Sequence, residues 1–227
     1  MTPYNVAPRR PSQTPGASAP GRTPSDRPPS WGSTSIPTTE RLLRAAEEEF
    51  AAHGFQNARL TEISAHAGMS RSSLMYHFES KQALYAAVIR HAMLRLDEAL
   101  SLATQGRDGP AARVLRGVEA YASFMESRPS LARLAVREVL GRGGNEPALL
   151  LDSGLALLER FEVLLAPHAS RGFPAREALV QIATGVILRV AGGDTAELAE
   201  RTLRAAELTF GEVLADEAHA TLPKASS

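Results

Sequence analysis

Prolines and glycines divide the chain from Thr38 onwards into segments of helical periodicity, and this pattern limits the fold more than any other feature. A proline stands where four segments begin, at Pro110, Pro129, Pro147 and Pro174, and the first turn of a helix accepts proline well. Apolar residues recur every three or four positions, and no convincing strand-like alternation accompanies them. The sequence therefore predicts an all-α protein of about nine helices. The expected ranges are 38–53, two short helices between 60 and 78, 80–105, 110–127, 129–140, 147–166, 174–190, and a last helix capped by Asp194 or Thr195 that runs to about 218.

The composition excludes several classes of protein. The 227 residues include 25 basic and 25 acidic side chains, so the formal net charge is zero, and there is no cysteine. A disulfide framework, a cysteine-ligated zinc site and a thiol nucleophile are therefore excluded. No apolar run approaches the roughly 20 residues of a membrane helix, and the first residues lack the apolar stretch of a signal peptide. We expect a cytoplasmic protein with no membrane partner, and neutrality argues against one that coats nucleic acid through bulk charge.

Residues 1–37 differ from the rest of the chain. They hold nine of the fifteen prolines, and four arginines against one aspartate give them a charge of +3. Proline removes backbone donors, and too few apolar residues remain to offset the entropy of ordering the segment. We predict a disordered arm over 1–37, either inert or in contact with DNA, and a short tail over 219–227.

Residues 60–78 carry the pattern of a helix-turn-helix. Gly68 permits a left-handed turn between two short helices, and Ser70 can cap the second one. Apolar residues such as Ile63 and Leu74 supply the contact between the two helices. Such a motif presents its second helix to the major groove of DNA, although many other helical corners share the pattern.

The flanking residues make the pattern more specific. The stretch from Glu40 to Leu84 resembles the amino-terminal DNA-binding domain of the TetR family of bacterial transcriptional regulators. The matching features are the run Ala46, Phe50, Gly54, Phe55, then Ile63, Ala67, Gly68, Ser70, and finally Leu74, Tyr76, His77, Phe78, Ser80, Lys81.

This resemblance implies an organisation and a function. It implies a helix-turn-helix DNA-binding domain over 38–84 and a larger helical ligand-binding and dimerisation domain over 85–218. A homodimer would bind a palindromic operator and regulate transcription, usually as a repressor that a small-molecule ligand releases. One departure concerns the start of the second helix, where the family usually has a threonine and this chain has Ala58. Arg59 or Thr61 is then the candidate for the phosphate contact.

The predicted DNA contacts are side chains that face outward from the second short helix and from the helix starts beside it. Arg71 can bind guanine through two hydrogen bonds, with a phosphate contact or a solvated side chain as the alternatives. Tyr76 would contact a phosphate or pack between helices, and Lys81 in the first turn of the next helix favours a phosphate. The complete predicted set is Arg59, Thr61, Ser70, Arg71, Ser72, Ser73, Tyr76, His77 and Lys81.

Charge is balanced within the predicted DNA-binding region. Residues 38–91 hold six basic and six acidic side chains, and we expect Glu47, Glu48 and Glu49 on a solvated part of the first helix. Affinity for DNA must then come from a few placed contacts, doubled by dimerisation.

The last two helices carry apolar surfaces suited to dimerisation. In the final helix, apolar residues recur in alternating steps of four and three, which is typical of helix–helix packing. The preceding helix is apolar on more than one side, as expected if its own domain and a partner both cover it. A core helix of a monomer is the alternative. The predicted interface consists of Leu179, Ile182, Val186, Leu203, Ala206, Phe210 and Val213.

The resemblance also implies a ligand cavity among the helices from Ser80 to Val190. Polar residues within apolar helices are the candidates for its polar contacts, although each could instead form an internal ion pair, cap a helix or face solvent. Because these candidates are few and their surroundings aliphatic, a hydrophobic small-molecule effector is favoured. The candidates are Arg137, Glu138, Gln181, Thr184 and Arg189.

Other function classes find little support. The sequence contains no phosphate-binding GxxxxGK[ST] loop and no GxSxG nucleophile elbow, and its six histidines lack metal-ligand spacing. We therefore expect neither an enzyme nor a bound metal or cofactor. The alternative that stays open is a TetR-like dimer that binds a ligand or a partner without specific DNA binding.

Overall fold

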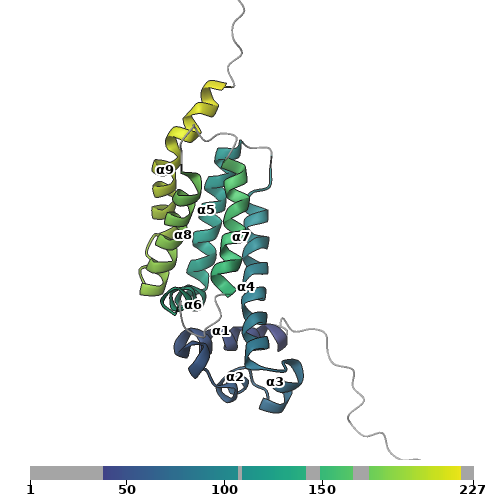
Figure 1. Cartoon of the computed structure of the whole chain (residues 1–227). Coiled ribbons are helices and arrows are strands. Elements are labelled where there is room, and N and C mark those ends of the chain that lie inside the picture. Colours follow the sequence, from purple (N-terminus) through teal and green to yellow (C-terminus); the bar gives the residue numbers. More distant parts are fainter. Residues whose placement is uncertain (1–37, 107–108, 142–148, 166–173, 221–227) are drawn as a thin grey trace, which may run out of the picture. The chain divides into compact units, whose positions relative to one another are not determined.

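The structure is a computed structural model that describes residues 38–106, 109–141, 149–165 and 174–220, with only the backbone at 110–111, 164–165 and 212–220. Every regular element within these residues is an α-helix (Figure 1). The helices are α1 Thr38–Asn57, α2 Leu60–His66, α3 Arg71–His77, α4 Lys81–Ala103, α5 Pro110–Ser127, α6 Pro129–Leu140, α7 Leu149–Leu165, α8 Ala175–Gly192 and α9 Leu198–Ala220. The predicted all-α class is confirmed, whereas the predicted arm and residues 221–227 lie outside the described residues.

Proline and glycine set the helix boundaries largely as expected. α5 and α6 begin at Pro110 and Pro129. The prediction that Asp194 or Thr195 caps the last helix is wrong, because α9 begins at Leu198. Gly193 takes a left-handed conformation with φ of 82° at the end of α8, and the next amide, of Asp194, then bonds back to a carbonyl of α8. These residues therefore close α8 instead of opening α9.

Helices α1 to α4 share one apolar core. The rings of Phe50 and Phe55 meet Tyr85 of α4 edge-on, with centroids 5.0 and 5.3 Å away. Ile63 of α2 and Leu74 of α3 are completely buried against the same cluster. α4 continues past this core and contacts α5 and α7 (Figure 1). One helix therefore joins the helix-turn-helix to the helices that follow it.

The acidic run of α1 lies differently from the prediction. Glu48 is exposed, but Glu47 and Glu49 are buried. Glu47 pairs with Arg128 and accepts a 2.5 Å hydrogen bond from Ser130. Glu47 therefore connects α1 to the start of α6 inside the protein. The expectation of three solvated glutamates was therefore wrong for two of them, because the i, i+2 pair faces neighbouring helices rather than water.

Candidate nucleic-acid interface

The turn between α2 and α3 has the conformation that its sequence predicts. Gly68 has a φ of 68°, a left-handed value that a side chain makes costly. The amides of Gly68 and Met69 bond back to Ala65 and Ser64 at 3.0 and 2.9 Å, which closes α2. The buried Ser64 donates to the carbonyl of Thr61. α2 therefore ends compactly, and α3 leaves it at a fixed turn.

Three serines organise the start of α3. The Ser70 hydroxyl accepts a 3.1 Å hydrogen bond from the amide of Ser73, so this side chain caps the helix. It also lies 2.8 and 2.9 Å from the hydroxyls of Ser72 and Ser73. The small side chains leave the amino-terminal turn of α3 accessible, and the cap holds that turn in place.

The outer face of α3 is polar and accessible. Leu74 points into the core, whereas Arg71, Tyr76 and His77 are exposed. Tyr76 is 88% exposed and touches the ring of His77 edge-on, with centroids 5.6 Å apart. A tyrosine that packed between helices would be covered, so the packing alternative for Tyr76 does not apply within this chain. Its ring and hydroxyl are available to a partner.

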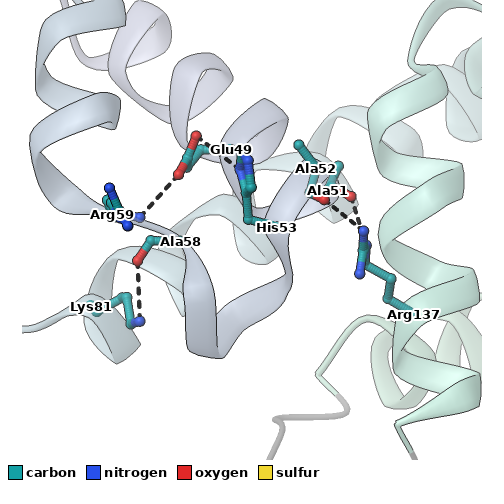
Figure 2. Close-up of polar contacts among 8 residues, drawn as sticks. All are labelled: Glu49, Ala51, Ala52, His53, Ala58, Arg59, Lys81 and Arg137. Atoms are coloured by element: carbon teal, nitrogen blue, oxygen red, sulfur yellow. Dashed lines mark hydrogen bonds and ion pairs between the residues drawn. The ribbon is translucent and has the colours of Figure 1, made fainter.

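The start of α2 is held by a side chain from α1. Ala58 is buried, and Arg59 at the amino-terminal cap position makes no side-chain capping bond. Instead, the carboxylate of Glu49 accepts the backbone N–H of Arg59 at 3.0 Å and also pairs with His53 (Figure 2). Glu49 thus does part of the work that a side-chain cap at this position would do. The guanidinium of Arg59 and the hydroxyl of Thr61 stay on the exposed surface.

Lys81 has an internal role that its sequence position did not indicate. Its ammonium donates to the carbonyl of Gln56 at 2.8 Å and to the carbonyl of Ala58 at 3.2 Å (Figure 2). It also lies 5.1 Å from the centroid of the Phe55 ring. Lys81 therefore ties the start of α4 to the α1–α2 connection. Because an ammonium has three donors, one of them is left for a phosphate.

Of the five predicted pocket residues, only Thr184 lines the apolar cavity that residues of α4 to α8 form. Arg137 donates to the carbonyls of Ala51 and Ala52 at the end of α1 (Figure 2), and Glu138 is buried in hydrogen bonds with α4 and α7. The prediction that Arg137 and Glu138 line the cavity is therefore wrong. Arg137 instead contacts the end of α1, and Glu138 contacts the start of α7. Gln181 and Arg189 are exposed and do not line the cavity.

The predicted dimer residues fall on two sides of α8 and α9. Leu179, Val186, Ala206 and Phe210 are buried within the chain. They present no surface to a partner, which corrects the prediction for these four. The physical reason is that α5 packs along α9, and α6 and α7 pack along α8. Ile182 and Leu203 are partly buried, and the side chain of Val213 lies outside the described residues.

The described residues contain neither a cluster of metal-ligating side chains nor a helix that could span a membrane. No group of three or more histidine, aspartate or glutamate side chains there is placed to hold a metal ion. None of the described helices is long and apolar enough to cross a membrane.

Comparison with known families identifies the amino-terminal helices. Residues 42–88, from α1 into α4, match the family model described as "Bacterial regulatory proteins, tetR family". Over these residues the chain is similar to this family. The matched stretch contains the whole of the α2–α3 motif, the exposed face of α3 and the start of α4.

Curated relatives match a larger part of the chain. The HTH-type transcriptional regulator RutR of Escherichia coli is 34% identical over 131 residues, which cover 58% of this chain and 61% of that protein. An uncharacterized HTH-type transcriptional regulator of Bacillus subtilis, YdgC, is 33% identical over 106 residues, or 45% and 54% of the two chains. The match thus spans a little over half the length of these relatives.

Solved structures share the fold over most of its length. A TetR-like transcriptional regulator from Rhodococcus has a TM-score of 0.62 at 24% identity, and the match covers 77% of this chain and 96% of that one. The regulator FadR of Bacillus subtilis, solved in complex with stearoyl-CoA, has a TM-score of 0.60 at 16% identity, with 75% and 97% covered.

Proposed function

We propose that this protein is a sequence-specific transcriptional regulator that binds an operator in double-stranded DNA. The observation that carries the proposal is the outer face of α3, where Arg71, Tyr76 and His77 are exposed on a helix held by a capped and glycine-closed turn. This arrangement suits insertion of α3 into the major groove. Arg71 near the start of the helix would read a base, and Tyr76 and His77 would contact phosphates. Such a regulator acts on the chromosome, which places it in the bacterial cytoplasm.

The DNA-bound form would be a homodimer. A single helix of seven residues contacts few base pairs, so two copies are needed to read a palindrome. α8 and α9 contact one another and carry exposed apolar side chains, with Val180 37%, Leu188 57% and Leu208 86% accessible. These three residues replace the buried ones as the proposed interface, since burying them against a second copy would remove apolar surface from water.

The cavity is the proposed site of a hydrophobic effector. Its volume is about 210 Å³, larger than the roughly 150 Å³ of an apolar cavity that admits benzene. The described residues that line it include no charged side chain, and the hydroxyl of the partly buried Tyr121 donates to the carbonyl of Ala183. A charged ligand group would lack a partner inside. The part of the effector within the cavity is therefore a hydrocarbon portion, in keeping with the acyl-CoA bound by FadR.

Binding of the effector would lower the affinity for the operator, so that the protein acts as a repressor that its ligand releases from DNA. A ligand changes DNA affinity only by its preference for one conformation of the protein. The cavity is lined by Leu96 and Leu100 of α4, the helix that begins four residues after α3 ends. A shift of α4 would move α3.

The decisive experiment is selection of binding sites from random DNA duplexes with the purified full chain. We expect an enriched palindrome and a dimer in the complex, with affinity that falls when stearoyl-CoA or long-chain primary alcohols are added. Enrichment of no sequence, with only salt-sensitive binding, would favour the alternative of a ligand-binding dimer without specific DNA recognition.

A further inference from the structure

Glu138 lies at the meeting point of three helices. It belongs to α6, is 3% exposed, and accepts a 2.6 Å hydrogen bond from the hydroxyl of Tyr85 on α4. Its other oxygen accepts the backbone N–H groups of Leu150 and Leu151, both at 3.0 Å. These amides lie in the first turn of α7, where a helix has no internal acceptors for them. The carboxylate is therefore the amino-terminal cap of a helix to which it does not belong.

The partners of Glu138 belong to two different parts of the protein, the wall of the cavity and the core of the DNA-binding helices. Leu150 and Leu151 line the apolar cavity, as does Gly154 one turn later. Tyr85 packs edge-on against Phe50 and Phe55 in the core beneath the helix-turn-helix. One carboxylate thus bonds the wall of the cavity directly to the helix that leads to α3.

The residue before Glu138 makes a parallel connection. Arg137 donates through Nε to the carbonyl of Ala51 at 2.7 Å and through its terminal nitrogen to that of Ala52 at 2.6 Å (Figure 2). Both carbonyls precede the bend of α1 at Gly54. The last turn of α6 therefore holds α1 through one side chain, and α4 and α7 through the next.

We propose that Glu138 is a positioning residue that couples the cavity wall to the DNA-binding helices. A movement of the first turn of α7 displaces the carboxylate, and the carboxylate displaces Tyr85 and with it α4. The regulatory role of this coupling rests on the proposed function. The hydrogen bonds that join α4, α6 and α7 through Glu138 are present in the free protein. Thr184 and the other lining residues would contact the effector, whereas Glu138 does not line the cavity.

The chemistry of the site supports this role over a purely structural one. A loss of stability alone would not reveal this role, because removal of Glu138 leaves two backbone N–H groups and a hydroxyl without their acceptor in any case. A carboxylate with three directional donors from two helices ties their positions together. When one of these helices moves, the other must follow or the hydrogen bonds to Glu138 break.

The test is amide hydrogen exchange at Leu150 and Leu151 in the full chain, measured with and without the DNA duplex obtained by selection. Glu138→Gln keeps one acceptor oxygen but removes the negative charge that strengthens the hydrogen bonds from both amides, so exchange at both amides should accelerate, by about tenfold for each 1.4 kcal/mol lost. Tyr85→Phe removes one hydroxyl and keeps the ring. In the unmodified protein, DNA should change exchange at these amides by about threefold or more, and in Tyr85→Phe this response should disappear.

Tyr121→Phe is the matched control, because it also removes a hydroxyl from a tyrosine within the helical core. That hydroxyl donates to α8 and makes no contact with Glu138. The DNA response at Leu150 and Leu151 should therefore survive in Tyr121→Phe. In the Glu138→Gln background, Tyr85→Phe should add nothing further, since both variants break one connection.

The outcomes separate this inference from the proposed function. Persistence of the DNA response in Tyr85→Phe, or additive effects of the two variants, overturns the coupling role. If selection yields no preferred duplex, the proposed function fails, and the connection is judged on the free protein. There, Tyr85→Phe must change exchange at Leu150 and Leu151 by about threefold or more while Tyr121→Phe does not; equal behaviour of the two variants refutes the connection.

Discussion

At the scale of single residues, Arg71 is the side chain on which sequence preference should depend. It is exposed at the start of α3, and its guanidinium has no partner among the described residues. A bidentate contact with guanine contributes about 1–3 kcal/mol of discrimination. We therefore expect Arg71→Ala to relax specificity at one position of the selected site, as measured by affinity for single-base variants of the duplex. An unchanged preference at every position would assign Arg71 to a phosphate or to solvent.

Arg59→Ala is the matched control for that measurement. Arg59 is equally exposed but lies at the start of α2, where a phosphate contact is expected. Its loss should weaken binding to all duplexes alike. The slope of log affinity against log salt concentration should become shallower by about one, because one fewer phosphate is neutralised. Lys81 is unsuited as a control, because its ammonium also holds the carbonyls of Gln56 and Ala58.

Glu138 should also make stability depend on pH. Burial raises the pKa of this carboxyl, and its hydrogen bonds from Tyr85, Leu151 and Leu150 offset this only in part. The folded state therefore binds the proton more tightly than the unfolded state does. Its contribution to the free energy of unfolding is greatest below the ordinary glutamate range and is lost as pH rises through the folded pKa.

Urea unfolding at a series of pH values from 4.5 upwards measures this dependence. We expect the free energy of unfolding to fall less steeply with rising pH in Glu138→Gln than in the unmodified protein. Glu48→Gln, a change on the exposed side of α1, should leave the profile as it is. Parallel profiles for Glu138→Gln and the unmodified protein would contradict the raised pKa.

The sequence indicated which residues are unusual but not what they contact. Arg137 and Glu138 stand out as charged residues in an apolar helix, and pocket contacts, ion pairs and caps all fit that pattern. Their partners Ala51 and Tyr85 lie 86 and 53 residues away in sequence. Only the packing of α6 against α1 and the hydrogen bond from Tyr85 of α4 decide among these roles. By contrast, Gly68 and Ser70 act on residues within the same turn, and both were predicted correctly.

At the scale of elements, the approach of α7 to α5 depends on the absence of one side chain. A Cβ added at Gly117 would lie 2.2 Å from the Phe161 ring, which lines the cavity. Gly117→Ala must displace this ring, at a cost of roughly 1–3 kcal/mol for overpacking. We expect a lower midpoint of urea unfolding, despite the gain that alanine usually brings within a helix.

Gly154 offers the contrasting substitution on the same cavity. A Cβ there would meet no atom within 4 Å, although Gly154 also lines the cavity. Gly154→Ala should raise stability by about 0.5–1 kcal/mol through helix propensity. Gly154→Leu should in addition occupy cavity volume and abolish binding of long-chain alcohols, measured by calorimetry. Full binding by Gly154→Leu would place the ligand elsewhere.

At the scale of the whole molecule, periodicity reveals apolar faces but not which surface covers them. Ala206 and Phe210 fit a dimer seam by their spacing, and yet both are fully buried within the chain. A helix packed on two sides has two apolar faces, and the sequence of one chain does not distinguish the internal face from the external one. Exposure makes that distinction, and it moves the expected interface to Val180, Leu188 and Leu208.

This revised interface is tested by placing charges on each face in turn. Leu188→Glu combined with Leu208→Glu would bury four carboxylates in a two-fold interface, and unpaired buried charges are strongly unfavourable. We expect light scattering to give a monomer for this variant and a dimer for the unmodified chain. Affinity for the palindrome should fall with it, because half of the contacts are lost. Leu102→Glu is the control, since Leu102 is 71% exposed on α4, away from α8 and α9. If the control variant dissociates and the double variant does not, the dimer forms through α4, and the spacing of the two α3 helices is set there instead.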